Sequence, residues 1–163
     1  MTSSDIVVGL DDSQAARAAL EWAAEQARTT GGPLRVVHVI DPPLLTDSGA
    51  TPGLDSSLSV DPGKVTPAVR NTMARLFDKV SPEASWQLEF SQGQVGRLLV
   101  ELAQPAALLV LGRGEHVGLG RLLIGSTSHY CLSHAECPVV AVPAQSTLHR
   151  LQQAEESVEA RAP

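Results

Sequence analysis

The chain has 163 residues with a hydrophobic fraction of 43%, which suits one globular domain with a single core. Its net charge of −6 argues against a general binder of nucleic acid or acidic membranes, because an acidic protein repels their phosphate charges. No apolar run approaches the roughly 18 residues that a membrane span needs, and MTSSDIVVGL lacks the regions of a signal peptide. We therefore expect a soluble, cytoplasmic protein.

The first part of the chain alternates strand and helix patterns. Residues Asp5 to Leu10 form a short apolar run, typical of a strand that is buried on both faces of a parallel sheet. Ser13 is a suitable N-cap for a helix that closes at Gly31, and a second strand pattern spans Leu34 to Ile40. Residues 41–63 are rich in Pro, Gly, Ser and Asp without periodicity, which predicts a long mobile loop within the domain.

The same alternation continues after this loop. A helix is predicted to begin at Thr66-Pro67 and to end near Ser81-Pro82. Residues Ser85 to Phe90 alternate apolar and polar side chains, as an edge strand does. Another helix follows Gly93 and stops at Gln104-Pro105, because the residue before a proline is disfavoured in the helical conformation.

A glycine-rich stretch follows the fourth strand pattern, LLVLG, and ends in the hydroxyl trio Ser126, Thr127 and Ser128. Glycine lets a backbone approach a ligand closely, because it has no side chain and tolerates positive φ. The start of a helix offers unpaired N–H groups and the positive end of its dipole to an anion. The stretch therefore predicts an anion site, with a mobile loop that ends in a helix cap as the alternative.

The helix after this stretch runs to about His134 and is followed by a fifth strand, VVAV, before Pro143. Cys131, His134 and Cys137 stand three apart, as metal ligands on a helix do, but no fourth ligand is evident and a packed thiol is the simpler interpretation. Residues 145–163 are polar and charged, which predicts a marginal helix or a disordered tail. The helix residues expected to face the core are Cys131, Leu132 and Ala135.

Alternating strands and helices predict a doubly wound α/β sandwich of three layers. Ligands bind such folds outside the carboxyl ends of the strands, where the winding reverses. If the first strand lies beside the fourth, Asp11 and Gly112 both border that crevice. The residues from Gly112 to Gly118 miss the dinucleotide pattern G-x-G-x-x-G, and the chain has no G-x4-G-K-[ST] phosphate loop.

Separate segments of the chain resemble the universal stress protein (UspA-like) family: IVVGLDDSQAARAAL, LRVVHVI, LLVLG and GSTSHYCLSHAECPVVAVP. The resemblance covers Asp5 to about Pro143, so we expect one such domain over residues 1–144. It implies a five-stranded parallel sheet of order 3-2-1-4-5, of the adenine nucleotide alpha hydrolase-like type. It also implies a homodimer paired through the last strand, residues 139–143.

The nucleotide-binding branch of that family is similar in a loop, G-x2-G-x9-G-[ST], that wraps the phosphates of ATP. On this chain the loop begins at Gly112 and closes at Gly125-Ser126, but its middle glycine falls on Glu115, with Gly114 as the nearest substitute. A carboxylate about 5 Å from a phosphate charge costs roughly 3 kcal/mol at an effective dielectric constant of 20. A Mg²⁺ ion between the two charges would soften the repulsion, as would the neighbours Arg113, His116 and Arg121.

The resemblance also implies a role for each residue of the site. Asp11 accepts hydrogen bonds from the ribose hydroxyls, and Gly9 and Leu10 line the adenosine. Val39 holds the adenine edge through its backbone. The ribose and the phosphates are then covered by Leu111, Gly112, Ser126, Thr127 and Ser128. The expected ligand is ATP, or AMP or ADP, with Mg²⁺ bound only through the nucleotide.

The sequence thus predicts an ATP-binding or adenine-nucleotide-binding regulatory protein of the stress response. The alternative, motivated by Glu115, is a nucleotide-independent dimeric interaction module of the same fold. A slow ATP-hydrolysing enzyme ranks last, because Asp11 is the one evident candidate for a base or metal carboxylate. No serine stands in a G-x-S-x-G turn either.

Overall fold

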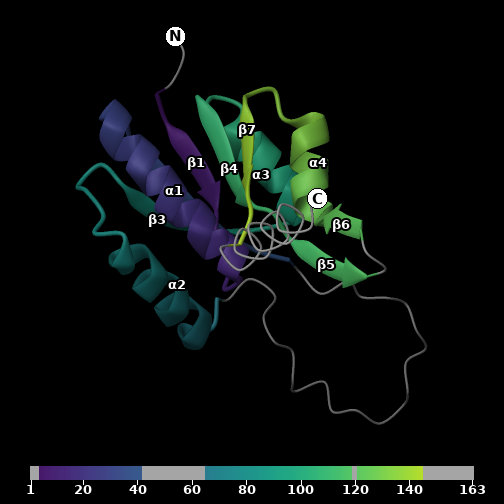
Figure 1. Cartoon of the computed structure of the whole chain (residues 1–163). Coiled ribbons are helices and arrows are strands. Elements are labelled where there is room, and N and C mark those ends of the chain that lie inside the picture. The colour runs from purple at the N-terminus through teal and green to yellow at the C-terminus, as the bar shows by residue number, and fades with distance from the viewer. Residues whose placement is uncertain (1–3, 42–64, 119–120, 145–163) are drawn as a thin grey trace, which may run out of the picture.

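The centre of the protein is a five-stranded sheet. The computed structural model describes residues 4–41, 65–118 and 121–144. All strand pairs of this sheet are parallel, and the order is β3-β2-β1-β4-β7 (Figure 1). Because β7 is the fifth strand of this sheet along the chain, the predicted order 3-2-1-4-5 is confirmed. The strands are β1 (Ile6–Gly9), β2 (Leu34–Ile40), β3 (Gln87–Gln92), β4 (Leu108–Gly112) and β7 (Val139–Val142).

Helices cover both faces of the sheet and make the three predicted layers. Val8, Val36 and Val110 pack into one hydrophobic core beneath the first pair of helices. Their neighbours Val7, Val37 and Leu109 pack into a second core beneath the other pair. Both faces of the central strands are therefore buried, which explains their continuous apolar runs. The pairs are α1 (Gln14–Thr30) with α2 (Pro67–Lys79), and α3 (Val95–Ala103) with α4 (Ser126–His134) (Figure 1).

The ends of α1 and α2 follow the capping residues in the sequence. The side chain of Ser13 accepts a hydrogen bond from the backbone N–H of Ala16 at 3.1 Å. At the other end of α1, Gly31 adopts the left-handed conformation with φ of 66°. Thr66 caps α2 in the same way as Ser13 caps α1. The predicted starts of both helices are confirmed.

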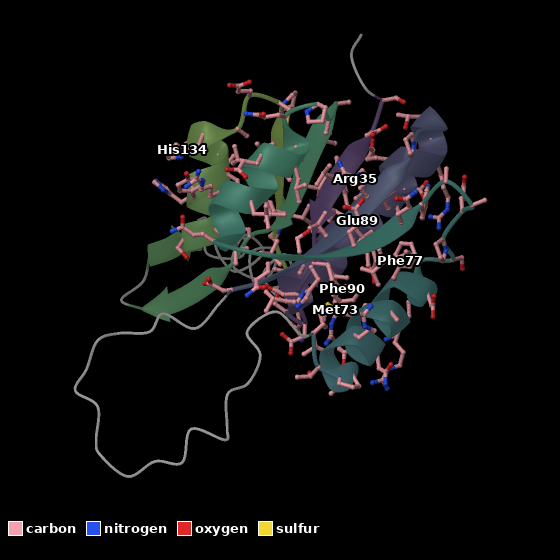
Figure 2. The ribbon with its side chains drawn as sticks, turned by 180° about the vertical axis from the view of Figure 1, so that it is seen from behind. Arg35, Met73, Phe77, Glu89, Phe90 and His134 are labelled. Carbon is pink, nitrogen blue, oxygen red and sulfur yellow. The ribbon has the colours of Figure 1, made fainter. Side chains whose placement is uncertain are left out.

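The edge strand β3 begins two residues later than the sequence pattern predicts. Trp86 is 5% exposed and packs into the core below α1 and α2, and its backbone N–H donates to the carbonyl of Glu83 in a turn. Since Ser85 and Trp86 belong to this turn, the ladder with β2 starts at Gln87. Beyond it, Phe90 packs with Met73 and Phe77 of α2 (Figure 2).

A bidentate ion pair joins β2 and β3 on the face that carries α3 (Figure 2). Nε and Nη2 of Arg35 donate to the two carboxylate oxygens of Glu89 at 2.9 and 3.0 Å. Arg35 also reaches the carbonyl of Leu102 in α3 at 3.4 Å. The hydrogen bonds to Glu89 raise the pKa of Arg35 further above its ordinary value. The ion pair between Arg35 and Glu89 therefore helps to hold the edge strand β3 against β2.

The glycine-rich stretch, for which the sequence predicts no strands, contains a hairpin. Strands β5 (Glu115–Gly118) and β6 (Arg121–Ile124) pair antiparallel, next to the start of α4 (Figure 1). The two strands were missed because dense glycines hide the strand pattern, whereas the ladder depends on pairing between two segments. The predicted mobile loop at 41–63, from residue 42 onward, and the predicted tail at 145–163 lie outside the described residues.

Helix α4 presents a narrower buried face than the sequence predicts. Cys131 is buried as expected, and Ala135 is half-buried. Leu132, expected to face the core, is 46% exposed. Ser128, three residues before Cys131, occupies the other buried position of the helix. None of the helices in the described ranges is long and apolar enough to cross a membrane.

Candidate functional site

A cavity of about 290 Å³ lies at the carboxyl ends of β1, β2 and β4. Its size is near the lower end of the roughly 300–1,000 Å³ that is usual for ligand pockets. Every predicted site residue except Gly125 lines it, so the fold brings together four separate segments of the chain. The predicted residues at the cavity are Gly9, Leu10, Asp11, Val39, Leu111, Gly112, Gly114, Ser126, Thr127 and Ser128.

The cavity exists because β1 and β4 separate at their carboxyl ends. Their ladder ends at Val8 and Val110, whereas β4 stays paired with β7 as far as Gly112. Beyond β1 the chain turns toward β2, where the N–H of Leu10 donates to the carbonyl of Val37 at 2.9 Å. This is the crevice at the reversal of winding that the sequence analysis expects to bind a ligand.

The floor of the cavity is apolar and includes residues that the sequence analysis did not assign to the site. Gly9 makes room for it, because a Cβ there would lie 2.9 Å from a methyl carbon of Leu111 and 3.1 Å from one of Leu99. For Ser13, Ala16 and Val95 the available signal was position, because they lie at or near the starts of α1 and α3, whereas Val37 and Leu99 lie in the middle of their elements. The missed lining residues are Ser13, Ala16, Val37, Val95 and Leu99.

Asp11 supplies the one charged side chain among the described residues that line the cavity. A carboxylate oxygen of Asp11 accepts the N–H of Ser13 at 2.8 Å, so the loop before α1 holds the side chain in place. An ionised carboxylate can accept several hydrogen bonds and donates none. Asp11 therefore retains capacity to accept bonds from ligand hydroxyl groups.

The start of α4 forms the end of the cavity whose backbone could accommodate an anion. Its N-cap is Gly125, and no side chain caps it. The N–H of His129 donates to the carbonyl of Gly125 at 2.9 Å. A helix leaves the N–H groups before that bond without intrahelical acceptors and carries a partial positive charge there. The N–H groups of Ser126, Thr127 and Ser128 therefore remain for an anion, whereas α1 is capped by Ser13.

Gly112 is required by packing between secondary-structure elements. A Cβ at this position would lie 2.5 Å from the carbonyl carbon of Ala15 and 2.5 Å from the nitrogen of Ala16. The end of β4 therefore touches the backbone of α1 directly. Gly112 is predicted from the sequence to let a ligand approach closely, and its contact with α1 adds a second reason for a glycine here.

Gly114 and Gly125 meet at the base of the hairpin. The N–H of Gly125 donates to the carbonyl of Gly114 at 3.1 Å, and a Cβ on Gly114 would lie 3.3 Å from the Cα of Gly125. This contact joins the end of β4 to the start of α4. Glu115 opens β5 opposite Ile124. Its side chain, like those of His116 and Arg121, lies outside the described part of the chain.

Cys131 and His134 do not share a face of α4, which removes the metal-ligand interpretation of their spacing. The Cys131 thiol is fully buried and lies 3.7 Å from the carbonyl of Gly96. His134 is exposed (Figure 2), and its ring stacks on that of Tyr130 with 4.1 Å between ring centroids. The interpretation of Cys131 as a packed thiol is confirmed. Within residues 4–41, 65–118 and 121–144, no group of three His, Cys, Asp or Glu residues could hold a metal ion.

The buried thiol predicts a loss of stability in alkaline solution. Burial, and to a smaller extent Cys137, raises the pKa of Cys131 to about 11. The unfolded chain releases this proton at lower pH, so the stabilisation is complete below about pH 8.5 and is lost as the pH approaches 11. We expect the free energy of unfolding to fall by about 2 kcal/mol more between pH 8 and 11 in the parent than in Cys131→Ala. Urea denaturation of both proteins measures this, and parallel pH profiles would contradict it.

The model of the universal stress protein family matches residues 3–143. A universal stress protein of Mycolicibacterium smegmatis is 31% identical over 143 residues, which are 86% of this chain and 48% of that protein. This chain thus spans about half the length of the curated relatives that it matches.

Solved structures agree with this match. The universal stress protein UspA from Lactobacillus plantarum superposes with a TM-score of 0.67 and 26% identity, covering 87% of this chain and 99% of that chain. A universal stress protein of Archaeoglobus fulgidus in complex with dAMP has a TM-score of 0.56 at 22% identity, over 87% of this chain and 99% of that one. At 22% identity, the similarity to the Archaeoglobus fulgidus structure supports the fold alone.

Proposed function

This chain belongs to the universal stress protein family, and from that premise we propose that it is an adenine-nucleotide-binding regulatory protein of the stress response. One observation carries the proposal. An apolar cavity has an acceptor carboxylate, Asp11, on its rim and the uncapped start of α4 in the same lining. A nucleoside phosphate has the matching order of groups: an apolar base, hydroxyl donors and an anion. The dAMP complex of the Archaeoglobus fulgidus relative supports this choice of ligand.

The binding mode follows from the lining residues. The base lies against the apolar floor beside Val39, whose backbone borders the cavity. Asp11 accepts hydrogen bonds from the ribose hydroxyls, and the first turn of α4 faces the phosphates. ATP, ADP and AMP share the first two of these contacts. Mg²⁺ joins the complex through the phosphates of ATP or ADP.

The alternative function is a nucleotide-independent interaction module of the same fold. Glu115 favours it, because this carboxylate follows directly on Gly114, which lines the cavity. A negative charge beside the phosphates weakens binding by Coulomb repulsion, which falls with distance and with salt. Whether the parent protein binds a nucleotide separates the two functions.

Calorimetric titration of the parent with Mg-ATP, AMP and adenosine tests the proposal. We expect binding by the parent and about tenfold tighter Mg-ATP binding by Glu115→Gly, because a like charge is removed near the phosphates. Adenosine, which carries no phosphate, is the control ligand and should bind both proteins equally. If the parent binds none of the three at millimolar concentration and Glu115→Gly binds Mg-ATP, the alternative function is correct.

We also propose that two copies of the chain pair through β7. This strand lies at one edge of the sheet, next to β4 alone among the described strands, and residues Val139 to Val142 are all half-buried. An apolar edge strand with free backbone groups is a ready surface for a second copy. Sedimentation velocity should give the mass of two chains, and a single-chain mass at micromolar concentration would refute the pairing.

A further inference from the structure

Ser128 differs from the two hydroxyl residues before it. It is 3% exposed and is the buried polar residue among those that the structure describes. Its hydroxyl donates to the carbonyl of Gly112 at 2.8 Å. Ser126 is exposed and Thr127 is half-buried at the same helix start. The three hydroxyls are therefore not equivalent, although the sequence assigns all of them to the phosphates.

The carbonyl of Gly112 needs this partner. The ladder between β1 and β4 ends at Val110, so Gly112 lies beyond it, where the crevice opens. A carbonyl that is partly withdrawn from water, as in half-buried Gly112, is less stable without a hydrogen bond, and its partial negative charge would also repel an anion in the cavity. The hydroxyl of Ser128 satisfies this oxygen and at the same time ties the first turn of α4 to the end of β4.

A serine hydroxyl has one proton to donate, and that of Ser128 is committed to Gly112. We propose that Ser128 is a positioning residue of the phosphate subsite, an inference that rests on the proposed function. Its hydroxyl holds the start of α4 in place and does not touch the phosphate, which Ser128 reaches through its backbone N–H. The side chains that donate to the phosphate are those of Ser126 and Thr127.

Affinities for AMP and adenosine distinguish positioning from mere support of the fold. Both ligands bind only folded molecules, so a purely structural loss leaves the ratio of their affinities unchanged. Ser128→Ala should lower the melting temperature and reduce that ratio about tenfold. Ser126→Ala, the matched control, should reduce the ratio without changing the melting temperature. A Ser128→Ala variant that melts lower but keeps the parent ratio would overturn the inference.

A double variant with Ser126→Ala and Ser128→Ala separates positioning by Ser128 from direct contact of its hydroxyl with the phosphate. If Ser128 orients Ser126, removing both hydroxyls costs less than the sum of the single losses, because the displaced Ser126 has already lost its contact. Additive losses would show that Ser128 binds the phosphate independently. The carbonyl ¹³C signal of Gly112 in ligand-free protein reports on its hydrogen bond to Ser128, because no ligand lies in the cavity to shift the signal.

The same NMR signal separates this inference from the proposed function. In ligand-free protein, Ser128→Ala should move the Gly112 carbonyl signal and the amide signals of Ser126 and Thr127. If the parent binds neither AMP nor adenosine, the proposed function fails, and these ligand-free shifts still decide whether Ser128 holds the start of α4. Unchanged amide signals at Ser126 and Thr127 would refute the positioning role.

Discussion

Replacing Gly112 with alanine is expected to destabilise the domain by about 3 kcal/mol, at the upper end of what over-packing usually costs. The new Cβ would lie 2.5 Å from backbone atoms of Ala15 and Ala16. A flexible side chain could rotate away from such a contact, but here the whole of α1 must move from the sheet. The melting temperature should fall by roughly 6–12 °C, which thermal denaturation followed by circular dichroism measures.

Gly31→Ala is the matched control for this substitution. Gly31 has a positive φ of 66°, and a Cβ built on it would meet no heavy atom within 4 Å apart from those of Gly31 and its chain neighbours. Its replacement costs only the strain of the left-handed conformation, about 1–2 kcal/mol. Gly112→Ala should therefore lower the melting temperature more than Gly31→Ala. Equal losses would contradict the direct packing of α1 on the end of β4.

The sequence predicts the fold where local patterns coincide with tertiary roles. Continuous apolar strands indicate burial on both faces, and Ser13 and Thr66 mark helix starts by local hydrogen bonding. The patterns fail where a distant contact decides. Trp86 lies in a strand-like alternation, but it is drawn into the core below α1 and so precedes the ladder. Strands β5 and β6 are missed for a different reason: they pair between neighbouring segments, but each has four residues and lies among glycines, so neither shows a clear strand pattern.

The candidate site is also predicted where it depends on position along the chain, and it is not predicted where it depends on tertiary contacts. Asp11 and Gly112 follow strands, so their meeting at one edge of the sheet can be inferred once the strand order is known. The partner of a hydroxyl cannot be inferred in this way. The bond from Ser128 to Gly112 depends on how α4 is docked, and so does the exposure of Leu132. The resemblance to a family identifies which residues gather, and the structure distinguishes their individual contacts.

Asp11→Asn is expected to weaken AMP binding between tenfold and a hundredfold. Hydrogen bonds to a charged acceptor contribute about 1.5–3 kcal/mol each, and a neutral amide oxygen accepts more weakly. Asparagine keeps an oxygen for the N–H of Ser13, which Asp11 accepts at 2.8 Å, so the loop before α1 should hold its shape. Removing the carboxylate also relieves its repulsion of the phosphate, by about 1 kcal/mol or less in solvent. Adenosine should therefore lose more affinity than AMP.

The neighbouring Asp12 makes the control for charge. Asp12→Asn removes the same charge one residue away, but Asp12 borders a second cavity beside α2, with His38 and Met73, and does not line the first. Calorimetry should show little change in AMP affinity for Asp12→Asn, and equal losses in both variants would mean that the acidic field as a whole acts on the ligand.

Comparison of AMP with dAMP locates the contact of Asp11 on the ribose. The parent should prefer AMP because Asp11 accepts from the 2′-hydroxyl, and this preference should shrink in Asp11→Asn. A preference that survives the substitution would place the ribose away from Asp11, even if the nucleotide still binds in the cavity.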